Sequence, residues 1–366
     1  MRMPLTGAQV WSGAEMARRS DWIEALDATE VQALLAAVAA VQSRGGEWID
    51  LQREAFVLGE ALQHRVQRVA DALEHGAGFV TLRNLPVEQL GEAGARIALW
   101  GLGAWLGEAV SQSRYGELLG EVRDYGEQLG TATARGYRTG SALRFHTDRC
   151  DLVALLCVRQ CERGGDSLVV STPHLHNVLR ERDPQALDLL YGDWFHSRQG
   201  EELPGERRWY RNPVFALHAG RFTSQYSRSY IESAQKFDEV PRLTPAQEAA
   251  LDAVAAAARE EAFQTRMQPG DLQILNNHVT WHGRTALEDA APPERKRVLF
   301  RLWLSSPLSR ALPDDFEELW GPTAAGAVRG GVVAHAGYRS VTELRTLRAA
   351  GRVPARAGWP LEGLPA

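Results

Sequence analysis

The chain has 366 residues, of which 44% are hydrophobic and 24% are charged. This balance is typical of a globular protein with a sizeable core and excludes a disordered or fibrous chain. The net charge of −5 and the scattered arginines argue against a nucleic-acid or anionic-membrane partner and favour a small molecule.

Residues 1–110 are expected to be mainly helical support. Apolar residues recur there at helical spacing in three segments, of which the first has Thr29 as its expected N-cap and the second ends on Gly76. The expected helices cover residues 29–42, 60–76 and 90–107. Between the last two, GFVTLR at 78–83 combines aromatic and β-branched residues and predicts a strand that enters the main sheet.

From residue 142 the pattern changes to short strand-like runs separated by Gly, Pro or Asp turns, which is typical of a β-sandwich or barrel. The expected strands cover residues 142–148, 151–158, 166–171, 193–197, 212–218, 271–277 and 297–304. Helical inserts are expected at 176–191 and at 244–262, where Thr244 precedes a proline. We assign 111–310 to the core and 311–366 to a C-terminal extension without a recognisable motif.

No linker-like or low-complexity tract divides the chain, so we expect one domain over residues 1–366. The start of the chain lacks the apolar stretch of a secretion signal, and no segment suits a bilayer span. The odd number of cysteines, Cys150, Cys157 and Cys161, excludes a disulfide scaffold and favours buried thiols over metal thiolates. These features predict a cytoplasmic protein, and a homo-oligomer is compatible with the sequence.

The triplet His146-Thr147-Asp148 places an imidazole and a carboxylate two residues apart on an expected strand. Alternation along a strand turns both side chains to one face. Together they supply two ligands of a facial triad, which leaves iron with open positions for a co-substrate and O₂, and the third ligand would be a distant histidine. The triplet alone also fits a hydrogen-bonded His/Asp pair.

Four blocks in this order resemble the taurine dioxygenase-like (TauD/TfdA, clavaminate synthase-like) family of 2-oxoglutarate oxygenases. The resemblance extends from about Gly76 to Leu304. The blocks are FHTD at 145–148, GGDS at 164–167, WHGRT at 281–285 and RVLFR at 297–301. The resemblance implies an α+β fold with a double-stranded β-helix (jelly-roll) core, and an Fe(II) enzyme that consumes 2-oxoglutarate and O₂.

The resemblance also implies roles for individual residues. His146, Asp148 and His282 would ligate Fe(II), and Arg297 would pair with the distal carboxylate of 2-oxoglutarate. An arginine fork suits that carboxylate because it binds bidentately and stays charged when buried. Ser167, where relatives often have Thr, would donate its hydroxyl to the same carboxylate.

Arg301 lies four residues after Arg297, so both side chains share one face of the last expected strand. In the family this second arginine contacts an anionic group of the substrate or co-substrate; a structural salt bridge is the alternative. His278 is the rival of His282, but two preceding asparagines favour a turn, which makes His278 a supporting or solvent-facing residue. His174 and His176 lie at an expected helix start and suit capping or packing.

The retained carboxylate of Asp148 favours hydroxylation, desaturation or cyclisation, since relatives that halogenate lack it. Ala142 and Phe145 replace the Asn and Trp of taurine-acting relatives and argue against taurine. Two loops are expected to form the substrate wall, with Tyr137 in the first and Tyr226, Arg228 and Tyr230 in the second. These aromatic residues suit a barrel mouth or a subunit contact equally well.

Two other functions fit parts of the pattern. A cupin-like hydrolase or isomerase would use the same His/Asp/His set with another metal, but would leave Arg297 and Ser167 without a role. A non-catalytic member would bind a dicarboxylate without oxidising a substrate. The sequence favours an oxygenase that hydroxylates a small polar, amino-acid-like or secondary-metabolite substrate.

Overall fold

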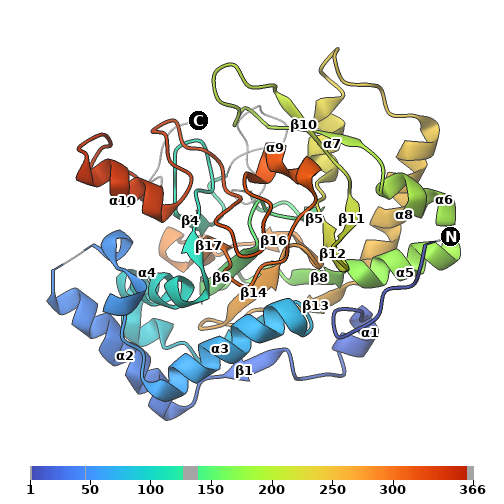
Figure 1. Cartoon of the computed structure of the whole chain (residues 1–366). Helices are drawn as coiled ribbons and strands as arrows, with labels where there is room; N and C mark the ends of the chain where they lie inside the picture. The colour runs from blue at the N-terminus through green and yellow to red at the C-terminus, as the bar shows by residue number, and fades with distance from the viewer. Residues whose placement is uncertain (1, 46, 127–138, 361–366) are drawn as a thin grey trace.

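The computed structural model describes residues 2–45, 47–126 and 139–360 (Figure 1). The helices are α1 (Gly13–Met16), α2 (Ala28–Ser43), α3 (Glu60–His75), α4 (Val87–Leu106), α5 (Thr172–Arg182), α6 (Pro184–Leu190), α7 (Arg228–Ala234), α8 (Pro245–Glu260), α9 (Glu317–Trp320) and α10 (Val341–Ala349). The strands of the first half are β1 (Ile23–Ala25), β2 (Phe79–Arg83), β3 (Glu108–Ala109), β4 (Leu119–Val122), β5 (Leu143–His146), β6 (Leu152–Arg159), β7 (Arg163–Gly164) and β8 (Ser167–Ser171). The remaining strands are β9 (Trp194–Ser197), β10 (Trp209–Asn212), β11 (Phe215–His218), β12 (Arg221–Ser224), β13 (Phe263–Thr265), β14 (Leu272–Asn276), β15 (Thr280–Arg284), β16 (Leu287–Glu288) and β17 (Val298–Ser305).

Two sheets form the centre of the described chain. The larger has the order β1-β2-β14-β6-β17-β3, with β4 also paired to β17, and the smaller has the order β13-β8-β15-β5. Side chains from both sheets meet in one buried cluster that includes Val153, Leu275, Val169 and Phe263. The expected α+β fold with a jelly-roll core is confirmed, and the interior between its sheets is where a site can form.

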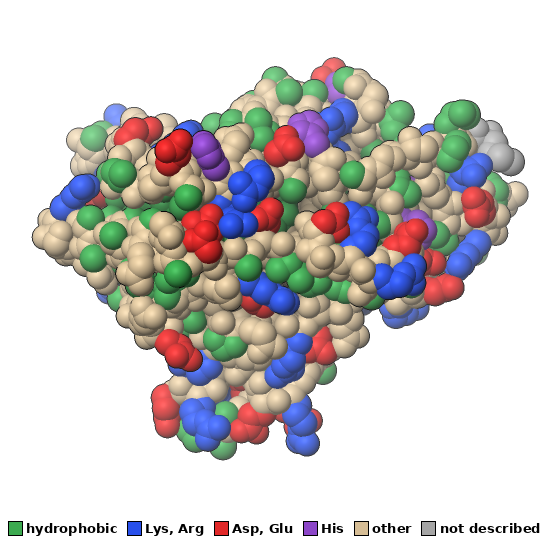
Figure 2. Space-filling model, turned by 90° about the horizontal axis from the view of Figure 1, so that it is seen from below, with side chains coloured by type: hydrophobic (Ala, Val, Ile, Leu, Met, Phe, Trp, Pro, Cys, Tyr) green, Lys and Arg blue, Asp and Glu red, His purple; other side chains and the backbone are tan. Residues whose placement is uncertain are grey.

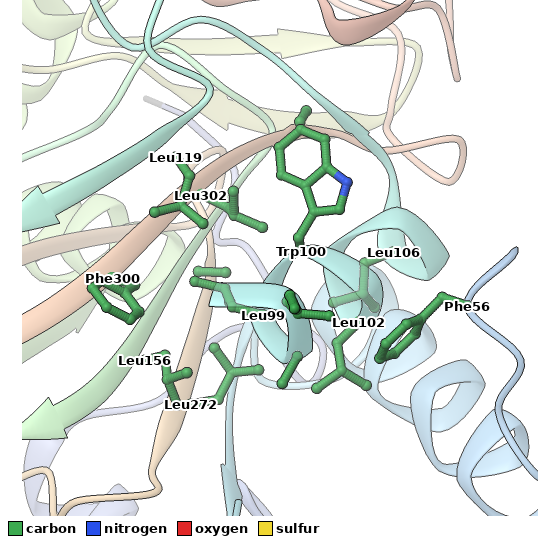
Figure 3. Packing of buried hydrophobic residues seen from close by; sticks show 14 of the residues in the cluster. Phe56, Leu99, Trp100, Leu102, Leu106, Leu119, Leu156, Leu272, Phe300 and Leu302 are labelled. Carbon is green, nitrogen blue, oxygen red and sulfur yellow. The ribbon is translucent and has the colours of Figure 1, made fainter. Parts of the chain in front are cut away.

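Strand β17 shows how alternation sorts side chains between the interior and the helices. Val298, Phe300, Leu302 and Leu304 belong to the large cluster that also contains the apolar residues of α4. Figure 3 shows this packing, with Leu99, Trp100, Leu102 and Leu106 of α4 lying against strand residues from β4, β6, β14 and β17. Arg301 therefore lies on the opposite, interior face, because successive strand residues point to opposite sides.

The two sheets are covered by different helices (Figure 1). Helices α2, α3 and α4, drawn in blue to cyan, lie on one side of the strands, and α5, α6 and α8, in green to yellow, lie on the other. On that second side Val170 of β8 and Trp281 of β15 pack with Leu175, Leu187 and Leu251 of the helices. The insert expected at 176–191 is two helices, because Asp183 ends α5 and caps α6 before Pro184.

Two expectations about secondary structure were wrong in detail. Helix α2 is capped by Asp27, not Thr29, since Asp27 and Glu30 form a reciprocal capping box. Strands β9 and β11 exist, but within the described part of the chain each pairs only with its hairpin partner, β10 or β12, outside both main sheets. Alternating apolar residues predict a strand without revealing which sheet it joins.

The C-terminal extension, which showed no motif, packs against the chain segment that follows β5. The amide of Gly331 donates to the carbonyl of Arg149 at 2.6 Å. Gly330 has φ +76°, and a Cβ there would lie 2.7 Å from the same carbonyl oxygen. Arg329 donates from Nε to the buried carboxylate of Asp151 at 2.8 Å. This extension therefore buttresses the segment that carries Asp148.

Cys150, Cys157 and Cys161 are buried free thiols, as expected. Burial raises the pKa of Cys150 well above its usual range, and burial also raises the pKa of Cys157 to about 12. Both groups are therefore protonated thiols at neutral pH. Among the described residues, no helix is both long and apolar enough to cross a membrane.

Candidate active site

The smaller sheet brings the expected ligands together. His146 ends β5, and its backbone pairs directly with that of His282 on β15. We expected Asp148 to lie on the strand, but it lies beyond the end of β5. Its position is fixed by other bonds, because its amide donates to Asn277 Oδ1 at 3.0 Å and the preceding Thr147 amide donates to the Tyr226 carbonyl at 2.8 Å.

The three side chains converge on one point in the interior. One ligand atom from each of His146, Asp148 and His282 lies within 4.8 Å of the others. Nε2 of His146 is 3.8 Å from one oxygen of Asp148, and Nε2 of His282 is 3.7 Å from the other. His146 Nδ1 lies 2.9 Å from the carbonyl of Arg144, an acceptor that fixes the proton on Nδ1 and leaves Nε2 as an electron-pair donor.

The environment keeps these donors in the protonation states that a metal requires. Burial and the nearby His146 lower the pKa of His282 to about 3, so its ring is neutral. Burial opposes ionisation of Asp148, but Arg301, the two histidines and Trp303 together hold its pKa below the usual range. Trp303 Nε1 donates to Asp148 at 3.0 Å. Two imidazole nitrogens and one carboxylate oxygen fit a facial Fe(II) site.

Arg297 and Ser167 lie on the same cavity. Arg297 is buried directly before β17; its Nε donates to Gln160 at 3.1 Å, and its Nη1 has no hydrogen-bond partner among the described residues. Burial lowers the pKa of Arg297, as it does for a cation without a close counter-ion. Ser167 donates its hydroxyl to Gln273 at 2.5 Å. A carboxylate beside Arg297 would pair with the buried guanidinium.

The glycines of the GGDS block permit this arrangement. Gly164 and Gly165 have φ +66° and +70°, a left-handed conformation that favours glycine. A Cβ on Gly165 would lie 2.7 Å from the sulfur of Cys161 and 3.5 Å from Nε of Arg297. The turn thus lets the chain pass close to Arg297 before β8 begins.

Arg301 lies beside the three expected ligands. Its Nε donates to Gln112 Oε1 at 2.7 Å, and its Nη1 is 3.8 Å from Asp148. Gln112 in turn donates from Nε2 to the backbone carbonyls of Leu118 and Arg301. Arg301 is therefore held in place beside the carboxylate of Asp148.

One cavity of about 540 Å³ is lined by the three expected ligands together with Gln112, Ser167, Arg297, Arg301 and Trp303. Arg228 and Tyr230 line it too, although Arg228 is paired with Glu232 at 2.9 Å and with Asp252 at 2.6 Å. The expectation for Tyr226 was wrong, because its ring is buried against Trp281, with ring centres 4.1 Å apart, and does not line the cavity. Tyr137 lies outside the described residues.

The sequence pattern of the taurine catabolism dioxygenase TauD, TfdA family matches residues 23–303. FR-33289 synthase from Streptomyces rubellomurinus is 34% identical over 334 residues, which cover 89% of this chain and 97% of that protein. The chain belongs to the TauD/TfdA family.

Three further proteins match this TauD/TfdA member with lower sequence identity. A uridine-5'-phosphate dioxygenase from a Streptomyces species is 29% identical over 49% of this chain and 70% of its own length. Asparagine oxygenase with Fe(II), hydroxyasparagine and succinate superimposes with a TM-score of 0.62 over 84% of this chain and 99% of that chain, at 19% identity. The oxygenase OrfP with iron and α-ketoglutaric acid superimposes with a TM-score of 0.61 over 84% of this chain and 99% of that chain, at 17% identity. The TauD/TfdA member is an oxygenase that depends on Fe(II) and 2-oxoglutarate.

Three further histidines of this TauD/TfdA member, His278, His174 and His176, have structural partners. His278 lies in the turn between β14 and β15, where it is 1% exposed and bonds to Asp151 at 2.8 Å and Thr223 at 2.8 Å, so it does not face solvent. His174 bonds to Glu261 at 3.0 Å. His176 lies between the Met3 carbonyl and the Tyr191 hydroxyl.

Sequence reasoning missed the residues that hold the site residues of the TauD/TfdA member in place. These are Gln112, which fixes Arg301, Asn277, which fixes the Asp148 amide, Gln273, which accepts from Ser167, and Trp303. A local signal existed for Trp303 alone, because it follows Arg301 by two positions on one strand and so shares its face. The partners of the other three come from distant segments.

Proposed function

We propose that His146, Asp148 and His282 hold Fe(II), and that Arg297 and Ser167 hold 2-oxoglutarate for hydroxylation of a small polar substrate. The observation that carries this proposal is the convergence of two imidazoles and one carboxylate within 4.8 Å. It is supported by the buried guanidinium of Arg297 on the same cavity, whose Nη1 has no hydrogen-bond partner in the part of the chain that the structure describes. Such a donor is expected where a carboxylate binds.

The metal, the co-substrate and the residues proposed to bind them each have a role in the reaction that their surroundings suit. Fe(II), when bound, supplies the O₂ chemistry, and 2-oxoglutarate is converted to succinate and CO₂. Arg297 neutralises the distal carboxylate, and Ser167 donates to it after its hydroxyl turns away from Gln273. The apolar side chains of Leu155, Met267 and Leu299 line the same cavity and keep water from its closed end.

The presence of Asp148 favours hydroxylation over halogenation, with desaturation or cyclisation as other outcomes. We place the enzyme in the subclass of oxygenases that couple substrate oxidation to decarboxylation of 2-oxoglutarate. Arg228 and Tyr230 remain our proposed residues of the substrate wall, since both line the cavity. The free thiols support a reducing compartment, so we propose the cytoplasm.

The test is succinate release by the protein loaded with Fe(II) and supplied with 2-oxoglutarate and O₂. We expect turnover in the wild type and none in His146→Ala, because two remaining ligands do not retain Fe(II). Iron content is measured on both proteins, with His218→Ala, at a half-buried residue of β11 outside the cavity lining, as a control that keeps iron and turnover. Turnover retained by His146→Ala would refute the ligand assignment. Metal binding without succinate would favour the hydrolase or the non-catalytic alternative.

A further inference from the structure

Arg284 on β15 is a buried arginine to which the proposed function gives no task. Six arginines of the described chain are less than a tenth exposed. Two of them, Arg284 and Arg297, have no carboxylate within 4 Å among the described residues, and both line the active-site cavity. The other four each have a carboxylate oxygen within 4 Å; they are Arg198, Arg301, Arg310 and Arg329. Arg284 therefore shares with Arg297 the lack of a counter-ion that is expected at a carboxylate site.

The charge of Arg284 is costly where it lies. On the surface, basic side chains lie beside acidic ones, as Arg144 does beside Glu232 at 2.8 Å, and Figure 2 shows the two kinds interspersed on one face. Water and salt screen charges there. In the interior, burial and the nearby Arg297 lower the pKa of Arg284 to about 10, so the group is still charged at neutral pH. A bound anion would offset this cost.

Arg284 lies at the end of the cavity proposed for the distal carboxylate of 2-oxoglutarate. It follows His282 by two positions on β15, so both side chains point to the interior face. Its backbone pairs with that of Ser167 on β8. Directly opposed residues of antiparallel strands have Cβ atoms about 4.5–5.5 Å apart. Because Arg297 also acts on the pKa of Arg284, all three side chains lie around one place.

The hydrogen bonds of Arg284 orient its guanidinium and leave a donor unused. Its Nη2 donates to the carbonyl of Thr139 at 2.8 Å and to the carbonyl of Ser141. Its Nε is buried and has no hydrogen-bond partner in the described part of the chain. Residues 139–141 come shortly before β5, the strand that ends on His146. One side chain thus contacts both the cavity and the backbone that leads to a proposed metal ligand.

We propose that Arg284 is a second arginine for the distal carboxylate of 2-oxoglutarate, and that its bonds to Thr139 and Ser141 tie co-substrate binding to the backbone before β5. The proposal rests on the proposed function and adds a residue to the co-substrate site. A carboxylate accepts about four hydrogen bonds, so two guanidinium groups and one hydroxyl can share it. Once paired, the guanidinium is held more firmly, and so are the two carbonyls that it binds.

The test compares two acids that differ in the group that Arg284 is proposed to bind. 2-Oxopentanoate has the five-carbon 2-oxo acid chain of 2-oxoglutarate, with a methyl group in place of the distal carboxylate. Each acid is titrated calorimetrically into the Fe(II) protein in the absence of O₂. We expect Arg284→Gln to weaken 2-oxoglutarate binding about 10–100-fold, the loss typical of charge-assisted hydrogen bonds. The affinity for 2-oxopentanoate should not change.

Matched variants separate recognition from general damage. Arg284→Lys keeps the charge and should recover part of the affinity for 2-oxoglutarate. Arg163→Gln removes a positive charge at a side chain 79% exposed on β7 and should leave both affinities unchanged. Equal affinity of wild type and Arg284→Gln for 2-oxoglutarate overturns the inference. Equal losses for both acids overturn it too, because they would show that Arg284 only supports the fold.

Hydrogen exchange of the backbone amides in residues 139–146 measures the coupling. In the wild type, 2-oxoglutarate should slow this exchange more than 2-oxopentanoate does, and Arg284→Gln should remove the difference. A difference that persists in the variant overturns the coupling. Succinate release separates the two proposals. Turnover with 2-oxoglutarate binding that ignores Arg284 would refute this inference alone, whereas Arg284-dependent binding without turnover would leave it standing and refute the oxygenase.

Discussion

At the scale of single residues, Arg297 is the group whose environment demands a ligand most clearly. Its guanidinium is buried, and its Nε donates to the neutral amide of Gln160. A buried cation without a counter-ion is costly, because burial penalises the charged form. The bound dicarboxylate would remove this cost, so binding of 2-oxoglutarate and the charge of Arg297 are coupled.

We therefore predict that Arg297→Leu weakens 2-oxoglutarate binding by about 3–5 kcal/mol, the loss typical of breaking a buried charge pair. Iron binding should remain, since Arg297 is not among the three converging ligands. Titration of 2-oxoglutarate into the Fe(II) protein measures the effect. Arg163→Leu, at a side chain 79% exposed on β7, is the matched control. Unchanged co-substrate affinity in Arg297→Leu would mean that the pocket is misplaced.

The types of the site residues could be predicted from sequence, but their partners could not. The pairing of His146 with Asp148 could be predicted, because the two residues are only two positions apart in the sequence. The bonds that orient Asp148 join residues 129 and 155 positions apart, to Asn277 and Trp303. Tyr226 was misassigned for the same reason, since only the packed structure shows that Trp281 covers its ring.

At the scale of elements, the glycine pair of the C-terminal extension controls the segment after β5. Gly330 approaches the Arg149 carbonyl, and the Gly331 amide bonds to it. Val332, the next residue, lines the cavity. The extension is therefore part of the active-site wall, and its contacts act on the segment that carries both Asp148 and Arg149.

We predict that Gly330→Ala lowers stability by about 1–3 kcal/mol and reduces turnover, because a Cβ would press on the Arg149 carbonyl and strain a left-handed residue. Gly337→Ala is the control, since Gly337 has φ +86° but nothing within 4 Å of its added Cβ. Denaturant unfolding and succinate release are compared for both variants. Equal losses in the two would show that backbone strain, and not the contact with Arg149, is responsible.

The elements themselves were largely predictable, but their assembly was not. Apolar spacing identifies α3 and β17 because those elements are long and regular. Apolar spacing does not reveal that β9 and β11 lie outside the two main sheets. Strands of a separate hairpin and strands of a main sheet show the same alternation of apolar and polar residues. The extension lacked any signal because its role depends on glycine backbone contacts and on Arg329, not on a repeating pattern.

At the scale of the whole molecule, buried histidines tie stability to pH. Burial lowers the pKa of His196 to about 4 and also lowers the pKa of His278. A folded-state pKa below the unfolded value of 6.5 means that the unfolded chain binds more protons. The contribution to stability is thus complete above pH 6.5 and is lost as the pH falls toward the folded-state pKa.

We predict that the free energy of unfolding falls by about 2 kcal/mol for His196 alone between pH 7 and pH 5. His196→Phe removes the titrating group while keeping a ring that can stack on Tyr210. Unfolding of the metal-free protein in urea at several pH values should give a shallower pH dependence for this variant. A dependence identical to that of the wild type would show that His196 does not carry the effect.

The whole fold was the most predictable level, because family motifs in a fixed order specify the jelly roll even where local reasoning fails. The single domain over residues 1–366 stays a prediction.

The central claim concerns one metal centre built by β5, the segment after it and β15. The most direct measurement is anomalous diffraction at the iron edge from crystals grown with Fe(II) and without O₂. One peak within bonding distance of His146 Nε2, His282 Nε2 and an Asp148 oxygen is the expected result. A peak elsewhere, or none at these three atoms, would contradict the account.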